Sequence, residues 1–156
     1  MDYKKVIGKK VIRYDGVFGV IKEVDNCGNV HIKFEGDWFS GGYLYDPFMN
    51  EDVKFVDAEL QKEIDVKLNE IQNNNLELLN KSLAKDKKSE KFYITKDNED
   101  GSYDIVYSLD CDVNSAYIIF GFVVHEQQKE YRRLKNKWRR IRMYDSLTNE
   151  IIAQES

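Results

Sequence analysis

Short runs of apolar residues alternate with polar residues in the first third of the chain. Val30, Ile32 and Phe34 are separated by single polar residues, which is the two-residue period of a strand with one buried face. Turn-forming residues separate the runs, as at Asn26–Asn29, where Asn and Gly favour a hairpin. Five short strands in under fifty residues predict a small, strongly bent barrel. The expected strands cover residues 10–14, 17–24, 30–34, 43–45 and 53–56.

From residue 57 to about residue 84 the apolar period changes to three and four residues, which predicts a helix with one apolar stripe. Asp57 is the expected N-cap, and Asn73–Asn75 interrupt the stripe, so we expect a bend or one polar layer there. A helix of this length exceeds what the barrel can cover. We expect it to pack on the second half of the chain, with a homodimer through the 57–84 helix as the alternative. The stripe contains Leu60, Ile64, Leu68, Ile71, Leu78 and Leu79.

A charge-dense connector, Lys85–Lys91, separates this helix from a second set of strand-like patterns. Asp100–Gly101 is a hairpin turn between two alternating runs. Ala116–Val124 is almost entirely apolar, so we expect a central strand covered on both sides, with Gly121 marking a bulge or a close approach. The expected elements are strands at 92–96, 103–109 and 116–124, a helix at 125–136 and a closing hairpin at 143–153.

Four stretches in the first part of the chain match the pattern of one known module: Gly19–Ile21, Val30–Phe34, Tyr45–Phe48 and Asp57–Gln61. Between about residues 8 and 65 they resemble the SH3-like barrel module found at the front of uncharacterised bacterial and phage proteins. That module commonly runs into a helix with an acidic Glu-Leu-Gln opening. This chain has Tyr-Asp-Pro where the module has Tyr-Pro. The resemblance implies fold more than activity, because SH3-like barrels bind proteins, peptides or nucleic acid and seldom catalyse alone.

Together these patterns predict an α+β protein. The expected order is a small SH3-like β-barrel at residues 1–56, a long helix with its charged connector at 57–91, and an α+β module at 92–156. That last module should contain a small antiparallel sheet, one helix and a basic segment.

Composition limits the class of protein. The 156 residues, 42% of them hydrophobic, fit one domain or two small modules. The longest apolar run is too short to cross a bilayer as a helix, so no membrane partner is expected. The first residues lack the apolar core of a secretory signal, and two cysteines do not make a disulfide framework. We therefore expect a cytoplasmic protein.

The net charge of −4 hides a segregation of charge. Residues 129–142 carry eight basic groups against one acid, Glu130, and the rest of the chain carries a net charge of −11. Five of the six arginines lie in this segment, which favours planar, multi-donor recognition of an anion. A solvated surface is the alternative interpretation. The predicted binding residues are Lys129, Arg132, Arg133, Lys135, Lys137, Trp138, Arg139, Arg140, Arg142 and Tyr144.

If the chain is extended after the helix, one strand face is shared by Trp138, Arg140, Arg142 and Tyr144. Such a face suits stacking on bases while guanidinium groups hold phosphates. If the helix continues through Trp138, that side chain joins the core instead. The first hypothesis is a non-enzymatic binding protein whose outward-facing basic segment engages nucleic acid or another polyanion. The alternative is a protein-binding adaptor or inhibitor, encoded by a phage or mobile element, that blocks a partner's functional surface; an acidic protein surface would suit the basic segment.

Catalytic and cofactor motifs are not found, and we expect no enzyme activity and no cofactor. The chain has two histidines, His31 and His125, and its cysteines do not form the closely spaced pairs of a structural zinc site. Cys111 lies between two aspartates, whose charges are expected to raise the pKa of its thiol and so oppose a reactive thiolate.

Acidic residues cluster in the second half, at Asp104, Asp110 and Asp112. Carboxylates at strand ends are typical magnesium ligands, so a metal-dependent nuclease or hydrolase is a further alternative. Solvated turn acids are the interpretation we favour, and no metal site is predicted.

Overall fold

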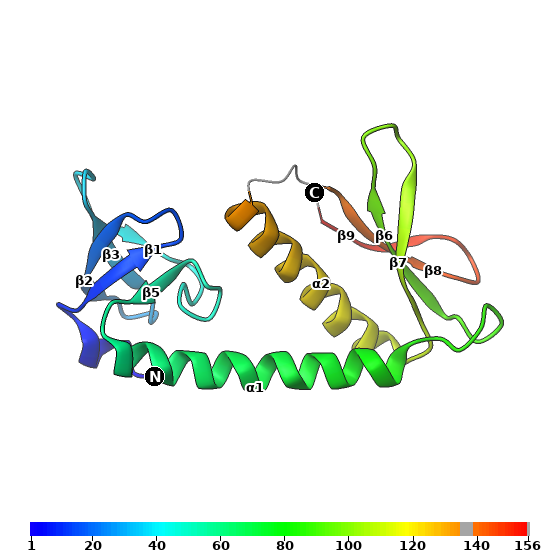
Figure 1. The fold of residues 1–156 in the computed structure, drawn as a ribbon, viewed down its shortest axis with the longest axis horizontal. Coiled ribbons are helices and arrows are strands. Elements are labelled where there is room, and N and C mark those ends of the chain that lie inside the picture. The colour runs from blue at the N-terminus through cyan, green and yellow to red at the C-terminus, as the bar shows by residue number, and fades with distance from the viewer. Residues whose placement is uncertain (135–138, 156) are drawn as a thin grey trace. The chain divides into compact units, whose positions relative to one another are not determined.

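The computed structural model describes residues 1–134 and 139–155, and of residues 133 and 134 only the backbone. This part of the chain contains two α-helices and two antiparallel β-sheets, so the predicted α+β class is confirmed (Figure 1). The chain forms two compact units, an N-terminal unit at Met1–Glu70 and a C-terminal unit at Ile71–Ser156. The predicted three-part division at 56/57 and 91/92 stays a prediction.

The N-terminal unit contains a five-stranded antiparallel sheet with the order β4-β3-β2-β1-β5. Four of the five predicted strands match an observed strand to within one residue at each end, because the alternation and the turn residues agree there. A short three-ten helix, η1, precedes the sheet. The elements are η1 (Tyr3–Val6), β1 (Lys10–Arg13), β2 (Phe18–Val24), β3 (Val30–Phe34), β4 (Gly41–Gly42) and β5 (Val53–Phe55).

The two-residue period in β3 has the predicted consequence. Val30, Ile32 and Phe34 are buried, and they form one hydrophobic core with residues from the neighbouring strands. His31, between them, is half-buried on the other face, where its ring nitrogen Nε2 lies 3.0 Å from the Asp25 carboxylate. The same face of the sheet is therefore available to polar and charged side chains.

The predicted strand at residues 43–45 is wrong. The fourth strand is instead the glycine pair of β4, which pairs with His31 and Ile32 of β3. A Cβ atom at Gly42 would lie 2.6 Å from Cε1 of His31, so the missing side chain allows β4 to approach the imidazole ring. Glycine has low strand propensity, which is why the aromatic residues that follow were expected to form the strand.

Helix α1 (Ala58–Ser82) begins where the sequence predicts. The Asp57 carboxylate accepts hydrogen bonds from the backbone N–H groups of Glu59 and Leu60, at 3.0 and 3.1 Å, which confirms Asp57 as the N-cap. The side chain of Gln61 accepts a hydrogen bond of 2.8 Å from the N–H of Phe55. The first turn of the helix is thus tied to the last strand of the sheet.

The apolar stripe of α1 serves two cores. Ile64 is buried in the core of the N-terminal unit, and Leu79 is buried in the core of the C-terminal unit. Between them Ile71 is about half exposed, and the helix continues without interruption through Asn73–Asn75. The two ends of the stripe therefore pack within the chain. Packing of the helix on the second half of the chain was the first of the two expectations, and the homodimer stays a prediction.

The C-terminal unit contains a four-stranded antiparallel sheet with the order β7-β6-β8-β9. Helix α2 packs on one face of it, where Ile94, Ile141 and Met143 are fully buried together with residues of the helix (Figure 1). Neither helix of the described chain is long and apolar enough to cross a membrane. The elements are β6 (Phe92–Asp97), β7 (Tyr103–Leu109), α2 (Val113–Leu134), β8 (Ile141–Asp145) and β9 (Ile151–Glu155).

The predicted central strand at residues 116–124 is wrong, because this segment is the first half of α2. Ala116, Ile119 and Val123 are buried at helical spacing, whereas Ile118 is 54% exposed. An apolar run of nine residues fits a buried strand and a helix equally well by period alone. The run was therefore assigned to the wrong kind of element.

The start of α2 contains the signal that distinguishes a helix from a buried strand at residues 116–124. Asp112 accepts a hydrogen bond of 2.7 Å from the N–H of Ser115, as an N-cap does. The expected bulge or close approach at Gly121 is also wrong, since a Cβ atom there would meet nothing within 4 Å. The predicted helix from His125 onward is the continuation of α2.

Candidate nucleic-acid interface

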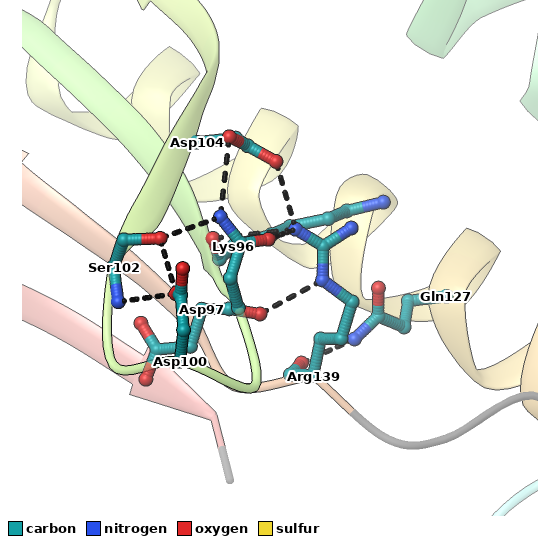
Figure 2. Close-up of polar contacts among 8 residues, drawn as sticks. Lys96, Asp97, Asp100, Ser102, Asp104, Gln127 and Arg139 are labelled. Carbon is teal, nitrogen blue, oxygen red and sulfur yellow. Dashed lines mark hydrogen bonds and ion pairs between the residues drawn. The ribbon is translucent and has the colours of Figure 1, made fainter.

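Arg139 lies just before β8 and binds the end of the β6–β7 hairpin (Figure 2). Its Nε donates a hydrogen bond of 2.8 Å to the carbonyl of Asp97, and its Nη2 donates one of 2.7 Å to the side chain of Asn98. Nη2 also lies 3.1 Å from the Asp104 carboxylate. The side-chain amide of Gln127, on α2, donates to the carbonyl of Arg139. Arg139 therefore joins two parts of the C-terminal unit, the β6–β7 hairpin through its guanidinium group and α2 through its backbone carbonyl.

The hairpin end that Arg139 binds is itself a polar network (Figure 2). Asn98 donates to the Ser102 hydroxyl at 3.0 Å and to Asp104 at 3.3 Å. The Ser102 hydroxyl donates to Asp100 at 2.5 Å, which holds the pKa of that carboxyl below its ordinary value. A carboxylate and carbonyl groups of this chain already bind Arg139, and its part in binding an outside anion stays a prediction.

Arg142 lies on the sheet face opposite the buried Ile141 and Met143, as the predicted alternation requires. Its Nη1 donates to both carboxylate oxygens of Asp97, at 2.8 and 3.0 Å, and its Nε donates to Gln154 at 3.0 Å. The side chain thereby links β8 to β6 and to β9. Its charge is balanced by Asp97, and its side chain is 20% exposed.

The other predicted binding residues have different positions. Lys129 lies on α2 with its Nζ 3.7 Å from Glu126, Arg132 is half-buried on the same helix, and Arg140 is exposed before β8. Arg133 lies within α2, and nothing further is described of its side chain. Lys135, Lys137 and Trp138 lie outside the described residues.

Three tyrosines stack on the face of the four-stranded sheet opposite its core. Tyr93 of β6 is the register partner of Tyr144 of β8, and their rings are 4.9 Å apart and nearly parallel, at 9°. The ring of Tyr103 of β7 lies 6.4 Å from that of Tyr144, at 26°. We call Tyr93, Tyr103, Tyr144, Arg142 and Ile105 the tyrosine face. Tyr103 and Ile105 are each about half exposed, so this face has a solvent-accessible aromatic surface.

Within the tyrosine face, the Tyr93 hydroxyl stays protonated at neutral pH. Burial is the largest cause that raises the pKa of Tyr93 above its ordinary value, followed by the neighbouring Tyr103 and Tyr144. The Tyr93 hydroxyl donates a hydrogen bond of 3.0 Å to Asn149, in the β8–β9 turn. The ring is thus held in place by a stacked neighbour on one side and a turn residue at its tip.

The acidic cluster is divided between the two ends of β7. Asp104 binds Arg139 at the hairpin end, whereas Asp110 lies 3.3 Å from Nζ of Lys91 and Asp112 caps α2. Within residues 1–134 and 139–155, no three Asp, Glu, His or Cys side chains are grouped as metal ligands. Each of the three acids therefore has a structural partner.

The pKa of the Cys111 thiol is raised, as expected. Burial is the largest cause, and the charges of Asp112 and Asp110 add to it, while a hydrogen bond with Ser82 acts in the opposite direction. A thiol with a raised pKa is a poor nucleophile at neutral pH.

Tyr144 and Arg142 were predicted from the sequence, whereas Tyr93 and Tyr103 were not. The available signal was the alternation within β6, where Tyr93 precedes the buried Ile94 and so must face away from the core. The pairing of β6 with both β7 and β8 brings the three rings together, and that pairing is a long-range property of the fold.

No protein-family model, no curated protein and no solved structure matches this chain. Its function is therefore inferred from the geometry of the described residues alone.

Proposed function

We propose that this chain is a non-enzymatic nucleic-acid-binding protein in which the tyrosine face stacks on the bases of a single strand. The observation that carries the proposal is the stacked group of Tyr93, Tyr144 and Tyr103 on a sheet face opposite the core. Aromatic rings on an exposed face offer stacking surfaces to unpaired bases, and each stacked base contributes about 1–3 kcal/mol. Duplex bases are already stacked and offer no such surface.

Within the basic segment, Arg140 is the residue proposed to supply a phosphate contact next to this face. Arg140 is exposed and lies two residues before Arg142 of the tyrosine face. The N-terminal unit has a net charge of −4, whereas acids and bases balance in the C-terminal unit. A polyanion is therefore repelled less by the C-terminal unit than by the chain as a whole.

Fluorescence anisotropy with a labelled oligothymidylate tests the proposal. Tyr144→Leu removes the central ring and keeps an apolar side chain, so we expect affinity to fall about tenfold, which corresponds to the loss of roughly one stacked base. Tyr117→Leu is the matched control, because Tyr117 lies on α2 and binds the carbonyl of Ile152. Equal affinity of the two variants, with both folded by circular dichroism, would reject the stacking role.

The phosphate contacts have a separate signature. Each cation that neutralises a single-strand phosphate contributes about 0.7 to the slope of log K against log salt concentration. Arg140→Gln is expected to reduce that slope by about this amount and to leave the dependence on Tyr144 unchanged. An unchanged slope would remove Arg140 from the interface.

The N-terminal unit is proposed to be an SH3-like module. The support is the antiparallel order β5-β1-β2-β3-β4 and the link between Gln61, in the predicted Glu-Leu-Gln opening of α1, and Phe55 of β5. Such a module would position a second binding surface on the same chain. The sheet is not closed by hydrogen bonds, since β4 and β5 are its two edges and do not pair with each other. An experimental structure in which the five strands have another order would contradict the proposal.

A specific observation favours protein binding as a second function. Trp38 is 96% exposed, and Phe39 and Leu44, from the same part of the N-terminal unit, are 76% and 89% exposed. Large exposed apolar side chains mark interaction surfaces, and Trp is enriched among residues that dominate binding energy. A stoichiometric partner protein that is lost with Trp38→Ser and kept with Tyr144→Leu would support the adaptor hypothesis.

A further inference from the structure

The sheet of the N-terminal unit carries a hollow of about 340 Å³ on the face opposite its core. Strands β1, β2 and β3 provide its lining. Three of the lining residues are lysines, one is an exposed aromatic residue, and one is an acid. The outward-facing residues of this lining are Lys10, Phe18, Val20, Lys22, Lys33 and Glu35.

The register of the three strands places two of these lysines in one row. Val20 pairs with Lys10 on one side and with Lys33 on the other. The neighbours Val11 and Ile32 are buried, so Lys10 and Lys33 must face away from the core. Strands are about 4.8 Å apart, which puts the two lysine positions about 10 Å from each other on either side of Val20.

The lining has a charge opposite to that of its surroundings. Three lysines face one acid, Glu35, in a unit whose net charge is −4. No ion pair of these lysines is found among the described residues. Phe18 is 44% exposed beside them, so the hollow offers cations and an aromatic ring together. Lysine ammonium groups suit phosphate oxygens, and an exposed ring suits a base.

We propose that this lysine hollow binds the phosphate backbone of a single-stranded nucleic acid, with the Phe18 ring against one base. The site is independent of the tyrosine face, because it lies in the other unit and uses other residues. If both sites are occupied, the chain contacts nucleic acid through both of its units.

The test uses the full chain and an oligothymidylate at low salt. Lys10→Gln, Lys22→Gln and Lys33→Gln are combined in one variant. The matched control combines Lys4→Gln, Lys5→Gln and Lys62→Gln, which remove the same charge from exposed positions of the same unit. The hollow variant is expected to reduce the slope of log K against log salt concentration by about 2, at about 0.7 for each phosphate contact. The control is expected to leave the slope unchanged.

Amide chemical shifts separate this site from the tyrosine face. The oligothymidylate is expected to shift the amide signals of Val20 and Lys33 in the wild type and in the Tyr144→Leu variant. Shifts at these amides without shifts near Tyr93 would support the hollow and reject the tyrosine face. Shifts near Tyr93 alone, or equal slopes for the hollow variant and its control, would overturn the hollow.

Discussion

Thr95 of β6 is a buried polar residue at the centre of the four-stranded sheet. It is 0% exposed, its register partners are Ile105 and Arg142, and its hydroxyl has no hydrogen-bond partner in the described part of the chain. A buried hydroxyl without a partner costs about 1–3 kcal/mol. Thr95→Val keeps the shape of the side chain and should raise the free energy of unfolding by about 1 kcal/mol in urea denaturation. A decrease would show that the hydroxyl is satisfied.

Asp25 should make the free energy of unfolding of the N-terminal unit depend on pH in the acid range. The His31 ring and then the Asn29 N–H lower the pKa of this carboxyl from 3.8 to about 2. A carboxyl whose pKa is lower in the folded state stabilises the protein above pH 4, and this contribution is lost as the pH falls from about 4 to about 2.

The measurement is the urea midpoint of the wild type and of Asp25→Asn at several values between pH 5 and pH 2. The substitution removes the titrating group, so the fall in stability through this range should be smaller in the variant. Parallel curves for the two proteins would mean that Asp25 titrates alike in the folded and unfolded chains.

At the scale of elements, Arg139 holds the β6–β7 hairpin to the segment that precedes β8. Arg139→Gln removes the ion pair with Asp104 and part of the hydrogen bonds to the hairpin, so we expect a loss of about 1–3 kcal/mol in stability. Hydrogen exchange should become faster at the amide of Asp97, which donates to the carbonyl of Arg140. Arg140→Gln keeps that carbonyl and is the control. Equal exchange in both variants would contradict the anchoring role.

Local signals predicted the elements whose patterns were unambiguous. Asp57 caps α1 as expected, and the alternation around Ile32 gives a strand with one buried face. The errors arose where the pattern fits two elements. The apolar run at residues 116–124 was assigned by composition, whereas the cap at Asp112 makes it helical. The glycines of β4 form a strand only because β3 pairs with them, and pairing cannot be read from two residues.

At the scale of the whole molecule, charge alone was an incomplete guide to the candidate site. The basic segment is evident in the sequence, but two of its arginines, Arg139 and Arg142, bind carboxylates that lie more than thirty residues away in the chain. The same long-range pairing brings Tyr93 and Tyr103 to Tyr144. Tyr144 was predicted because it alternates with buried residues of its own strand, whereas the other two rings depend on the order of the sheet.

The proposed function requires that bases, and not phosphates alone, bind the tyrosine face. The most direct measurement compares the affinity of the full chain for an oligothymidylate and for an abasic strand of equal length and charge. Stacking on the tyrosines predicts that the abasic strand binds at least about tenfold more weakly, and that Tyr144→Leu reduces this difference. Equal affinity for the two strands would contradict the claim and leave phosphate contacts as the whole of the interaction.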